Sequence, residues 1–136
     1  EASNLRILAV DDNPFNLFVL VTYLKKIKAD VVEAYNGQQC LQISESEDVM
    51  SNYFDLIFMD VQMPVLDGIE TSKIIKEKIK KGELKPVPII ALTAVNNKEI
   101  DMYKNESIKD LGIVDVLQKP AQEDQVKKLI KKHCHS

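Results

Sequence analysis

Four short apolar runs of this sequence are each followed at once by polar side chains of the kinds that carry chemistry. Taken singly, each has an ordinary explanation, because aspartates often cap helices or occupy turns and Lys-Pro is a common way to leave a strand. Together, at four matching positions, they predict one site. Asp11 and Asp12 follow the run 5–10, Asp60 follows 54–59, Thr93 follows 88–92, and Lys119 follows 114–118. The small residue Ala94 comes directly after Thr93.

The chemistry of this set is that of phosphoryl transfer. Three carboxylates in one site would repel one another and raise the pKa of at least one of them unless a cation intervenes. Lys119 offsets only one charge, and an oxygen-only, carboxylate-rich site favours a hard divalent ion, Mg²⁺ or Mn²⁺. A carboxylate beside such an ion can attack a phosphoryl group, which Lys119 and the Thr93 hydroxyl would neutralise and position. Ala94 is small and leaves room for the incoming group.

The elements that must position these residues follow from an alternation of five apolar runs with five amphipathic segments. Strands joined by helices indicate βαβ units, hence a parallel sheet with helices on both faces. In such sheets the working crevice lies beyond the carboxyl ends of the strands. The expected strands are 5–10, 30–34, 54–59, 88–92 and 114–118; the expected helices begin at Asn13-Pro14 and lie near 37–47, 68–81, 97–110 and around 126–133.

Composition and missing motifs exclude several classes of protein. The 136 residues suggest one domain over 1–136, and a net charge of −3 with intermixed signs gives no nucleic-acid signature. The four glycines form no phosphate-binding loop, and both histidines lie in the last four residues, so no Ser-His-Asp set can be built. The two distant cysteines are typical of a reduced, cytoplasmic protein, and no run is long enough to span a membrane. The missing initial methionine suggests a piece cut from a longer polypeptide, although a terminus produced by processing or cloning would look the same.

Four motifs, in order, resemble the receiver domains of response regulators in two-component phosphorelays. The resemblance covers about 5–132, nearly the whole chain. The opening "DDNPFN" and the central "MDVQMPVLDG" are most similar to receivers attached to hybrid histidine kinases. The matching pieces are "ILAVDDNPFN", "LIFMDVQMPVLDGIE", "PIIALTA" and "DVLQKP".

The resemblance implies a flavodoxin-like, doubly wound, five-stranded parallel sheet of order 2-1-3-4-5 with five helices. It implies that Asp60 is the phosphoacceptor and a metal ligand, that Asp12 binds Mg²⁺ directly, and that Asp11 binds it mainly through water. The backbone carbonyl of Gln62 would be the third protein ligand.

The other implied roles concern the phosphoryl group and the partners. Thr93 would swing toward the phosphoryl group, Lys119 would pair with it, and Ala94 would stand beside it. Such domains catalyse their own phosphorylation from a phosphohistidine and, to varying degrees, their own dephosphorylation. The implied partners are a histidine kinase domain and a histidine-phosphotransfer protein. We expect a cytoplasmic domain, monomeric in isolation, with no direct membrane contact, in a parent chain that is a hybrid histidine kinase.

Three departures from the family pattern concern the response to phosphorylation and the length of the connecting segments. Val116 stands three residues before Lys119, where the family usually has Tyr or Phe, so we predict a response through the loop around Thr93 without a rotamer exchange at Val116. The interval from Thr93 to Lys119 is longer than usual by about one helical turn. The segments 44–53 and 80–87 also look extended, and both are expected to lie away from the strand ends that carry the chemistry.

Alternatives to the hybrid-kinase receiver remain open at this point. A stand-alone, single-domain response regulator would share every motif. An Asp-nucleophile phosphatase of the haloacid dehalogenase type would need a second aspartate two residues after Asp60, where this chain has Gln62. A degenerate receiver that acts only as a binding module would lack some of the catalytic residues. The first helix, which carries Phe15 and Phe18, is the expected docking surface for the phosphotransfer partner. One of these two side chains would be exposed there, although such residues more often belong to the core.

Overall fold

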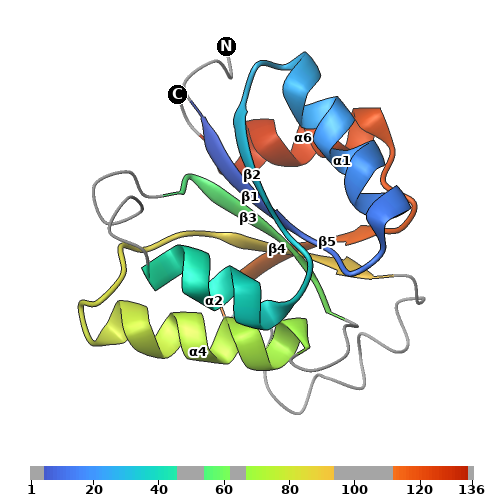
Figure 1. Cartoon of the computed structure of the whole chain (residues 1–136). Helices are drawn as coiled ribbons and strands as arrows, with labels where there is room; N and C mark the ends of the chain where they lie inside the picture. The colour runs from blue at the N-terminus through green and yellow to red at the C-terminus, as the bar shows by residue number, and fades with distance from the viewer. Residues whose placement is uncertain (1–4, 46–53, 62–66, 94–111, 135–136) are drawn as a thin grey trace.

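The structure is a computed structural model that describes residues 5–45, 54–61, 67–93 and 112–134. Its centre is a five-stranded sheet in which every pairing is parallel and the strand order is β2-β1-β3-β4-β5 (Figure 1). The order expected from the resemblance is therefore confirmed. The strands are β1 (Arg6–Val10), β2 (Asp30–Ala34), β3 (Leu56–Asp60), β4 (Ile89–Thr93) and β5 (Ile113–Gln118).

Helices cover both faces of the sheet, as the βαβ pattern predicts. In Figure 1, α1 and α6 lie on one face, and α2 and α4 lie on the other. The helix expected at 97–110 lies outside the described residues. Within the described ranges, no helix is both long and apolar enough to cross a membrane. The described helices are α1 (Pro14–Lys26), α2 (Gly37–Glu45), α4 (Gly68–Lys80) and α6 (Glu123–His133).

The central strands supply two apolar cores, one on each face. Every residue of β3 is buried, and its side chains alternate between the cores. Leu56 and Phe58 join the cluster that contains residues of α1 and α6, whereas Ile57 and Met59 join the cluster that contains residues of α2 and α4. A shift of one residue would exchange the two sets of side chains, so burial on both faces fixes the register and, with it, the position of Asp60 at the strand end.

Local signals explain where the two helices nearest the expected site begin. Asn13 caps α1, because its side-chain oxygen accepts hydrogen bonds from the backbone N–H groups of Phe15 at 2.9 Å and Asn16 at 3.1 Å. Pro14 occupies the first turn, where a missing N–H costs nothing. Asp67 caps α4 by accepting from the Glu70 N–H at 2.8 Å. Both starts agree with the sequence-based expectation.

The segment that joins α4 to β4 lies at the opposite edge of the sheet from the strand ends that carry the chemistry. It follows the end of α4 at Lys80 and leads into the first residue of β4, Ile89. Gly82 ends the helix with a positive φ of 78°, a conformation that glycine adopts without steric cost. The expectation that 80–87 is remote from the chemistry is confirmed, whereas 46–53 lies outside the described residues.

Candidate functional site

Three aspartates converge at the carboxyl edge of the sheet. Asp11 and Asp12 follow β1, and Asp60 is the last residue of the neighbouring strand β3. Carboxylate oxygens of all three lie within 4.8 Å of one another. Asp11 is 1% exposed and Asp60 is 0% exposed, whereas Asp12 faces solvent. Adjacency in a parallel sheet has thus brought together side chains 49 residues apart in the sequence.

One ammonium group lies among these carboxylates. Lys119 Nζ is 3.1 Å from Asp60 Oδ2 and 3.5 Å from Asp11 Oδ2, and the Lys119 side chain is only 11% exposed. Its backbone is held as well, because the Lys119 N–H donates to the Thr93 carbonyl at 2.7 Å. We call Asp11, Asp12, Asp60 and Lys119 the carboxyl-edge cluster. One positive charge against three carboxylates leaves the cluster with an excess of negative charge.

The electrostatics of the cluster reflect this excess. Desolvation raises the pKa of the Asp12 carboxyl above its ordinary value, and the hydrogen bond and negative charge of Asp60 raise it further. The ammonium of Lys119 acts in the opposite direction and offsets part of the effect. A cation bound at this place would relieve the repulsion that disfavours the ionised form of Asp12.

The donor set fits a hard divalent ion. Asp11 Oδ1 accepts the Asn13 N–H at 2.9 Å, which orients the carboxylate. Asp11 Oδ2 is buried, and among the described residues it has no hydrogen-bond partner. A buried carboxylate oxygen that has an ion pair with Lys119 but no hydrogen bond, beside two further carboxylates, is the oxygen-rich environment that Mg²⁺ prefers. The residues present therefore fit the Mg²⁺ (or Mn²⁺) that the sequence predicts.

The remaining predicted site residues divide between those that the structure describes and those that it does not. Thr93 ends β4, is 1% exposed, and accepts the Lys119 N–H through its carbonyl, so it lies beside the cluster. Ala94 and Gln62 lie outside the described residues, and their predicted roles stay predictions. The same is true of the loop after Thr93, through which we expect the response to phosphorylation.

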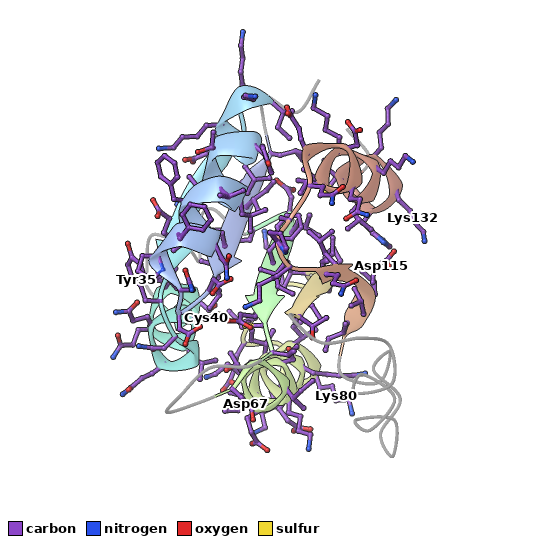
Figure 2. The ribbon with its side chains drawn as sticks, turned by 90° about the vertical axis from the view of Figure 1, so that its right-hand side faces the viewer. Tyr35, Cys40, Asp67, Lys80, Asp115 and Lys132 are labelled. Atoms are coloured by element: carbon purple, nitrogen blue, oxygen red, sulfur yellow. The ribbon has the colours of Figure 1, made fainter. Side chains whose placement is uncertain are left out.

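A close contact between α4 and β3 was not foreseen from the sequence. A Cβ atom at Gly68 would overlap with the carbonyl oxygen of Asp60 and would lie 2.8 Å from the carbonyl carbon of Asp60 and from Cα of Val61. Only glycine therefore lets the start of α4 approach the end of β3 so closely. Asp67 and Lys80 mark the two ends of this helix in Figure 2. The dipeptide "DG" indicates a turn, but the contact depends on how strand and helix pack.

Val116, the main departure from the family pattern, lies half-buried in β5 beside Ala91 of β4. It packs against the core cluster on the α2 and α4 face. Its backbone N–H donates to Oδ1 of Asp115 at 3.0 Å. The small side chain is thus accommodated as part of the core.

Comparison with known proteins agrees with this fold. The family described as "Response regulator receiver domain" matches residues 7–131. The chain is 34% identical over 131 residues to hybrid signal transduction histidine kinase L of Dictyostelium discoideum, a match that covers 94% of this chain and 7% of that protein. The chain thus spans only a small part of this relative.

Solved structures give the same result. The receiver domain of sensor histidine kinase PA1611 from Pseudomonas aeruginosa PAO1, with a magnesium ion in its active-site cleft, has a TM-score of 0.75 at 28% identity and covers 96% of this chain and 97% of that one. A chain from the Saccharomyces cerevisiae complex of the histidine phosphotransfer protein Ypd1 with the receiver domain of Ssk1 has a TM-score of 0.80 at 33% identity, covering 98% of this chain and 90% of that one. With the family match over 7–131, the fold and the carboxylates at its carboxyl edge, the chain belongs to the response-regulator receiver domains of two-component phosphorelays.

Proposed function

We propose that this domain accepts a phosphoryl group from a phosphohistidine onto Asp60 and passes it to a histidine-phosphotransfer protein. The observation that carries the proposal is the placement of Asp60: its carboxylate is buried, 3.1 Å from Lys119 Nζ and within 4.8 Å of two further carboxylates. A nucleophile held at the end of a buried strand, with groups beside it that neutralise phosphoryl charge, is what such a transfer requires.

The chemistry assigned to the chain's own residues is simple. A carboxylate oxygen of Asp60 forms the new P–O bond while the P–N bond to the donor imidazole breaks, and the imidazole keeps that electron pair and takes up a proton. Lys119 donates to a phosphoryl oxygen and holds the charge, and Thr93 donates its hydroxyl to another. Asp11, Asp12, Asp60 and the backbone carbonyl of Gln62 would hold Mg²⁺ (or Mn²⁺), which would supply positive charge to the phosphoryl oxygens.

The partner surface is assigned to the start of α1. Phe15 is 69% exposed and Phe18 is 68% exposed, although phenylalanine is usually a core residue. Both lie within the first turns of the helix that follows Asp11 and Asp12. Exposed aromatic side chains in the helix that follows Asp11 and Asp12 suit a partner that must bring its phosphohistidine close to Asp60. The complex of Ypd1 with the Ssk1 receiver domain supports a phosphotransfer protein as this partner.

We assign the domain to a hybrid sensor histidine kinase in the cytoplasm, with the kinase domain as donor. The support is that hybrid kinases stand among its relatives, each of which is much longer than this chain. A stand-alone response regulator is the alternative. A longer open reading frame that encodes a histidine kinase domain upstream would support the first assignment, and a reading frame that ends with this domain alone would support the second.

Acetyl phosphate with Mg²⁺ tests the acceptor directly. We expect one hydroxylamine-labile phosphate per chain, measured by intact-protein mass, and none when the metal is chelated. Asp60→Asn should abolish incorporation, whereas Asp30→Asn, the same change at an exposed residue of β2, should leave it intact. Unchanged labelling of the Asp60→Asn variant would refute the assignment.

Docking is tested separately by the rate of transfer to a phosphotransfer protein. Phe15→Ala and Phe18→Ala should each slow transfer about tenfold, the effect of removing one aromatic anchor from an interface. Their labelling by acetyl phosphate and their thermal stability should stay close to wild type, because both side chains are exposed. Val114→Ala, at an exposed apolar residue of the edge strand β5, is the control. Equal transfer rates in all four proteins would place docking elsewhere.

A further inference from the structure

A third exposed aromatic side chain stands at the carboxyl edge of the sheet, outside the docking surface assigned to α1. Tyr35 is 47% exposed and directly follows β2. The last residue of that strand, Ala34, pairs with Val10, and its carbonyl accepts the Asp11 N–H at 3.2 Å. Tyr35 is therefore next in the chain to a residue that is bonded to the carboxyl-edge cluster. Figure 2 shows it on the side of the molecule away from β5, the strand at the other end of the sheet.

The backbone of Tyr35 is held by the start of α2. Its N–H donates to Oε1 of Gln39 at 2.7 Å, and the Gln39 N–H in turn donates to Oδ1 of Asn36 at 2.8 Å. The Asn36 carbonyl accepts the Cys40 N–H at 3.1 Å, which begins the helix. This reciprocal capping fixes the direction in which the side chain of Tyr35 leaves the chain. A ring presented in a fixed direction loses less conformational entropy when a partner covers it.

The polar end of the Tyr35 side chain is free. Among the residues that the structure describes, its hydroxyl makes no hydrogen bond. Tyrosine combines a large apolar ring with a polar tip, and it is one of the residues that most often anchor protein interfaces. The position, the fixed backbone and the free hydroxyl thus suit a contact with another protein.

An acidic side chain defines the charge of that contact. Neighbouring residues of an extended strand point to opposite faces, so Glu33 and Tyr35, which flank Ala34, leave the strand on the same side. Glu33 is exposed and has no ion pair within the described part of the chain. An aromatic ring beside an unpaired carboxylate attracts a cationic side chain, arginine above all. The excess of negative charge in the carboxyl-edge cluster acts in the same direction.

We propose that Tyr35 is a specificity-determining residue for the phosphotransfer protein, whose cationic side chain lies on the Tyr35 ring beside the Glu33 carboxylate. The inference rests on the proposed function, because it assigns a second contact to the same docking event. Phe15 and Phe18 offer apolar area to any surface of suitable shape. Tyr35 and Glu33 select a partner that carries a cation at one position, which is how related partners are told apart.

Transfer from the phosphorylated domain to the Saccharomyces cerevisiae phosphotransfer protein Ypd1 tests the contact. Each domain is labelled with acetyl phosphate beforehand, so the assay reports docking and transfer alone. Tyr35→Ala should raise the Ypd1 concentration that gives half the maximal rate about fivefold, the loss of one exposed cation–π contact, with little change in the rate at saturation. Val114→Ala, at an exposed apolar residue of β5, should behave as wild type. An unchanged half-saturating concentration in Tyr35→Ala would overturn the proposal.

Two further substitutions at position 35 test the charge of the occupant. Tyr35→Phe keeps the ring face and should stay within about twofold of wild type, whereas Tyr35→Leu keeps apolar area without a ring and should lose as much as Tyr35→Ala. Transfer by Tyr35→Leu equal to that of wild type would refute the cationic occupant.

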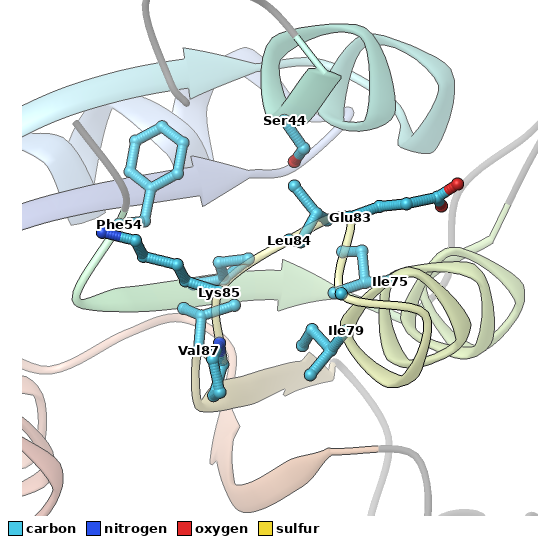
Figure 3. Close-up of a pocket in the computed structure, with 11 residues that line it drawn as sticks. Ser44, Phe54, Ile75, Ile79, Glu83, Leu84, Lys85 and Val87 are labelled. Carbon is cyan, nitrogen blue, oxygen red and sulfur yellow. The ribbon is translucent and has the colours of Figure 1, made fainter. Parts of the chain in front are cut away.

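The carboxylate is tested by a matched pair of charge removals. Glu33→Gln should raise the half-saturating concentration about twofold, because an exposed ion pair contributes little. Glu83→Gln removes a charge at the other edge of the sheet and should have no effect. Figure 3 shows the Glu83 carboxylate there, pointing away from the other labelled residues. Equal effects of the two changes would show that net charge, and not a contact at Glu33, attracts the partner.

Binding without chemistry separates this inference from the proposed function. Titration of the unphosphorylated domain with Ypd1 should shift the ring resonances of Tyr35 together with those of Phe15 and Phe18. Shifts of the two phenylalanines without Tyr35 would refute this inference alone. A wild-type domain that takes up phosphate but neither binds Ypd1 nor transfers to it would refute the onward transfer and this inference with it.

Discussion

Two clusters in this protein pair an aspartate with a lysine at the same distance, yet their balance of donors and acceptors is opposite. Asp60 Oδ2 lies 3.1 Å from Lys119 Nζ, and Asp115 Oδ2 lies 3.1 Å from Lys132 Nζ. In the carboxyl-edge cluster, one ammonium serves three carboxylates. At Asp115, which Figure 2 shows beside Lys132, one carboxylate receives several donors.

The donors to Asp115 make it a structural anchor. Besides Lys132, it contacts His133 Nε2 at 3.0 Å through Oδ2 and accepts the Val116 N–H through Oδ1. Burial acts to raise the pKa of Asp115, but these hydrogen bonds and the charge of Lys132 outweigh it and lower the pKa below its ordinary value. The cluster joins β5 to the end of α6 and needs no further cation. We call Asp115, Lys132 and His133 the Asp115 cluster.

The difference shows how to distinguish a binding site from a structural ion pair when both contain the same residue types. A surplus of donors around a carboxylate stabilises its ionised form and completes its bonding. A deficit of donors around buried carboxylates costs stability and leaves a place for a cation or a charged substrate. Among the described residues, the carboxyl-edge cluster has one ammonium for three carboxylates, whereas Asp115 alone has Lys132, His133 and the Val116 N–H.

Replacement of the lysine should give the largest difference in stability between the two clusters. Lys119→Met leaves Asp11 and Asp60 buried without their ammonium, and we expect a loss of about 3 kcal/mol in the free energy of unfolding. Lys132→Met acts on a side chain that is 67% exposed, and the expected loss is about 0.5 kcal/mol. Urea denaturation with chelator present measures both. Equal losses would mean that the two clusters are electrostatically alike.

Replacement of Gly68, which lies against the Asp60 carbonyl, should have the next largest effect on stability. Gly68→Ala places a Cβ against the Asp60 carbonyl, and we expect a loss of about 2 kcal/mol together with slower phosphorylation, because the end of β3 must shift. Gly82→Ala is the control, since a Cβ there meets nothing within 4 Å and only its positive φ is unfavourable, at about 1 kcal/mol. Thermal unfolding and acetyl phosphate labelling measure the two effects. Normal labelling of Gly68→Ala would show that the close approach does not position Asp60.

Addition of Mg²⁺ should stabilise the folded state through the carboxyl-edge cluster and not through the Asp115 cluster. A ligand at ten times its dissociation constant stabilises the folded state by about 1.4 kcal/mol. We expect this rise in wild type and in Asp115→Asn, but not in Asp12→Asn, when thermal unfolding is compared at constant ionic strength. A similar rise in Asp12→Asn would place the ion elsewhere.

Lowering the pH should remove the stability that the ionised Asp115 contributes, and this effect should be smaller. The pKa of Asp115 is lower in the folded state than in the unfolded chain, so the unfolded state binds more protons between the two values. The contribution is therefore full above roughly pH 4, the ordinary range of the group, and is lost as the pH falls through the folded value. Because the carboxylate is partly exposed, we expect less than about 1 kcal/mol.

The matched variant makes this last effect measurable. The difference in unfolding temperature between wild type and Asp115→Asn should shrink steadily below about pH 4. Asp30→Asn, at an exposed residue of β2, controls for the loss of a surface charge. A difference that stays constant with pH would show that the donors around Asp115 do not stabilise its ionised form.

The sequence alone predicts much of this site because its signals are local. Continuous apolar runs identify β3 and β4 as strands buried on both faces, and the residue after a strand lies at the working edge of a parallel sheet whatever the details. Asn13-Pro14 likewise marks the start of α1 by its capping chemistry, and the turn signal Asp67-Gly68 stands at the start of α4. Asp11, Asp12, Asp60, Thr93 and Lys119 could therefore be assigned to one site before any distance was known.

Other features depend on contacts between segments far apart in the chain. The sequence does not show which of Asp11 and Asp12 is buried, yet Asp11 is buried beside Lys119 and Asp12 faces solvent. It does not say that Phe15 and Phe18 are both exposed, because their spacing also fits a core-facing helix.

The sequence by itself identifies the apolar runs that form the strands and the residues that follow them. Those residues indicate phosphoryl-transfer chemistry. The contact of Lys119 with Asp60 at 3.1 Å and the need for glycine at position 68 depend on the tertiary structure. The physical reason is the distance along the chain over which each effect acts. Periodicity and capping act within a few residues, whereas burial, pKa and cavities are set by the neighbours that packing brings together.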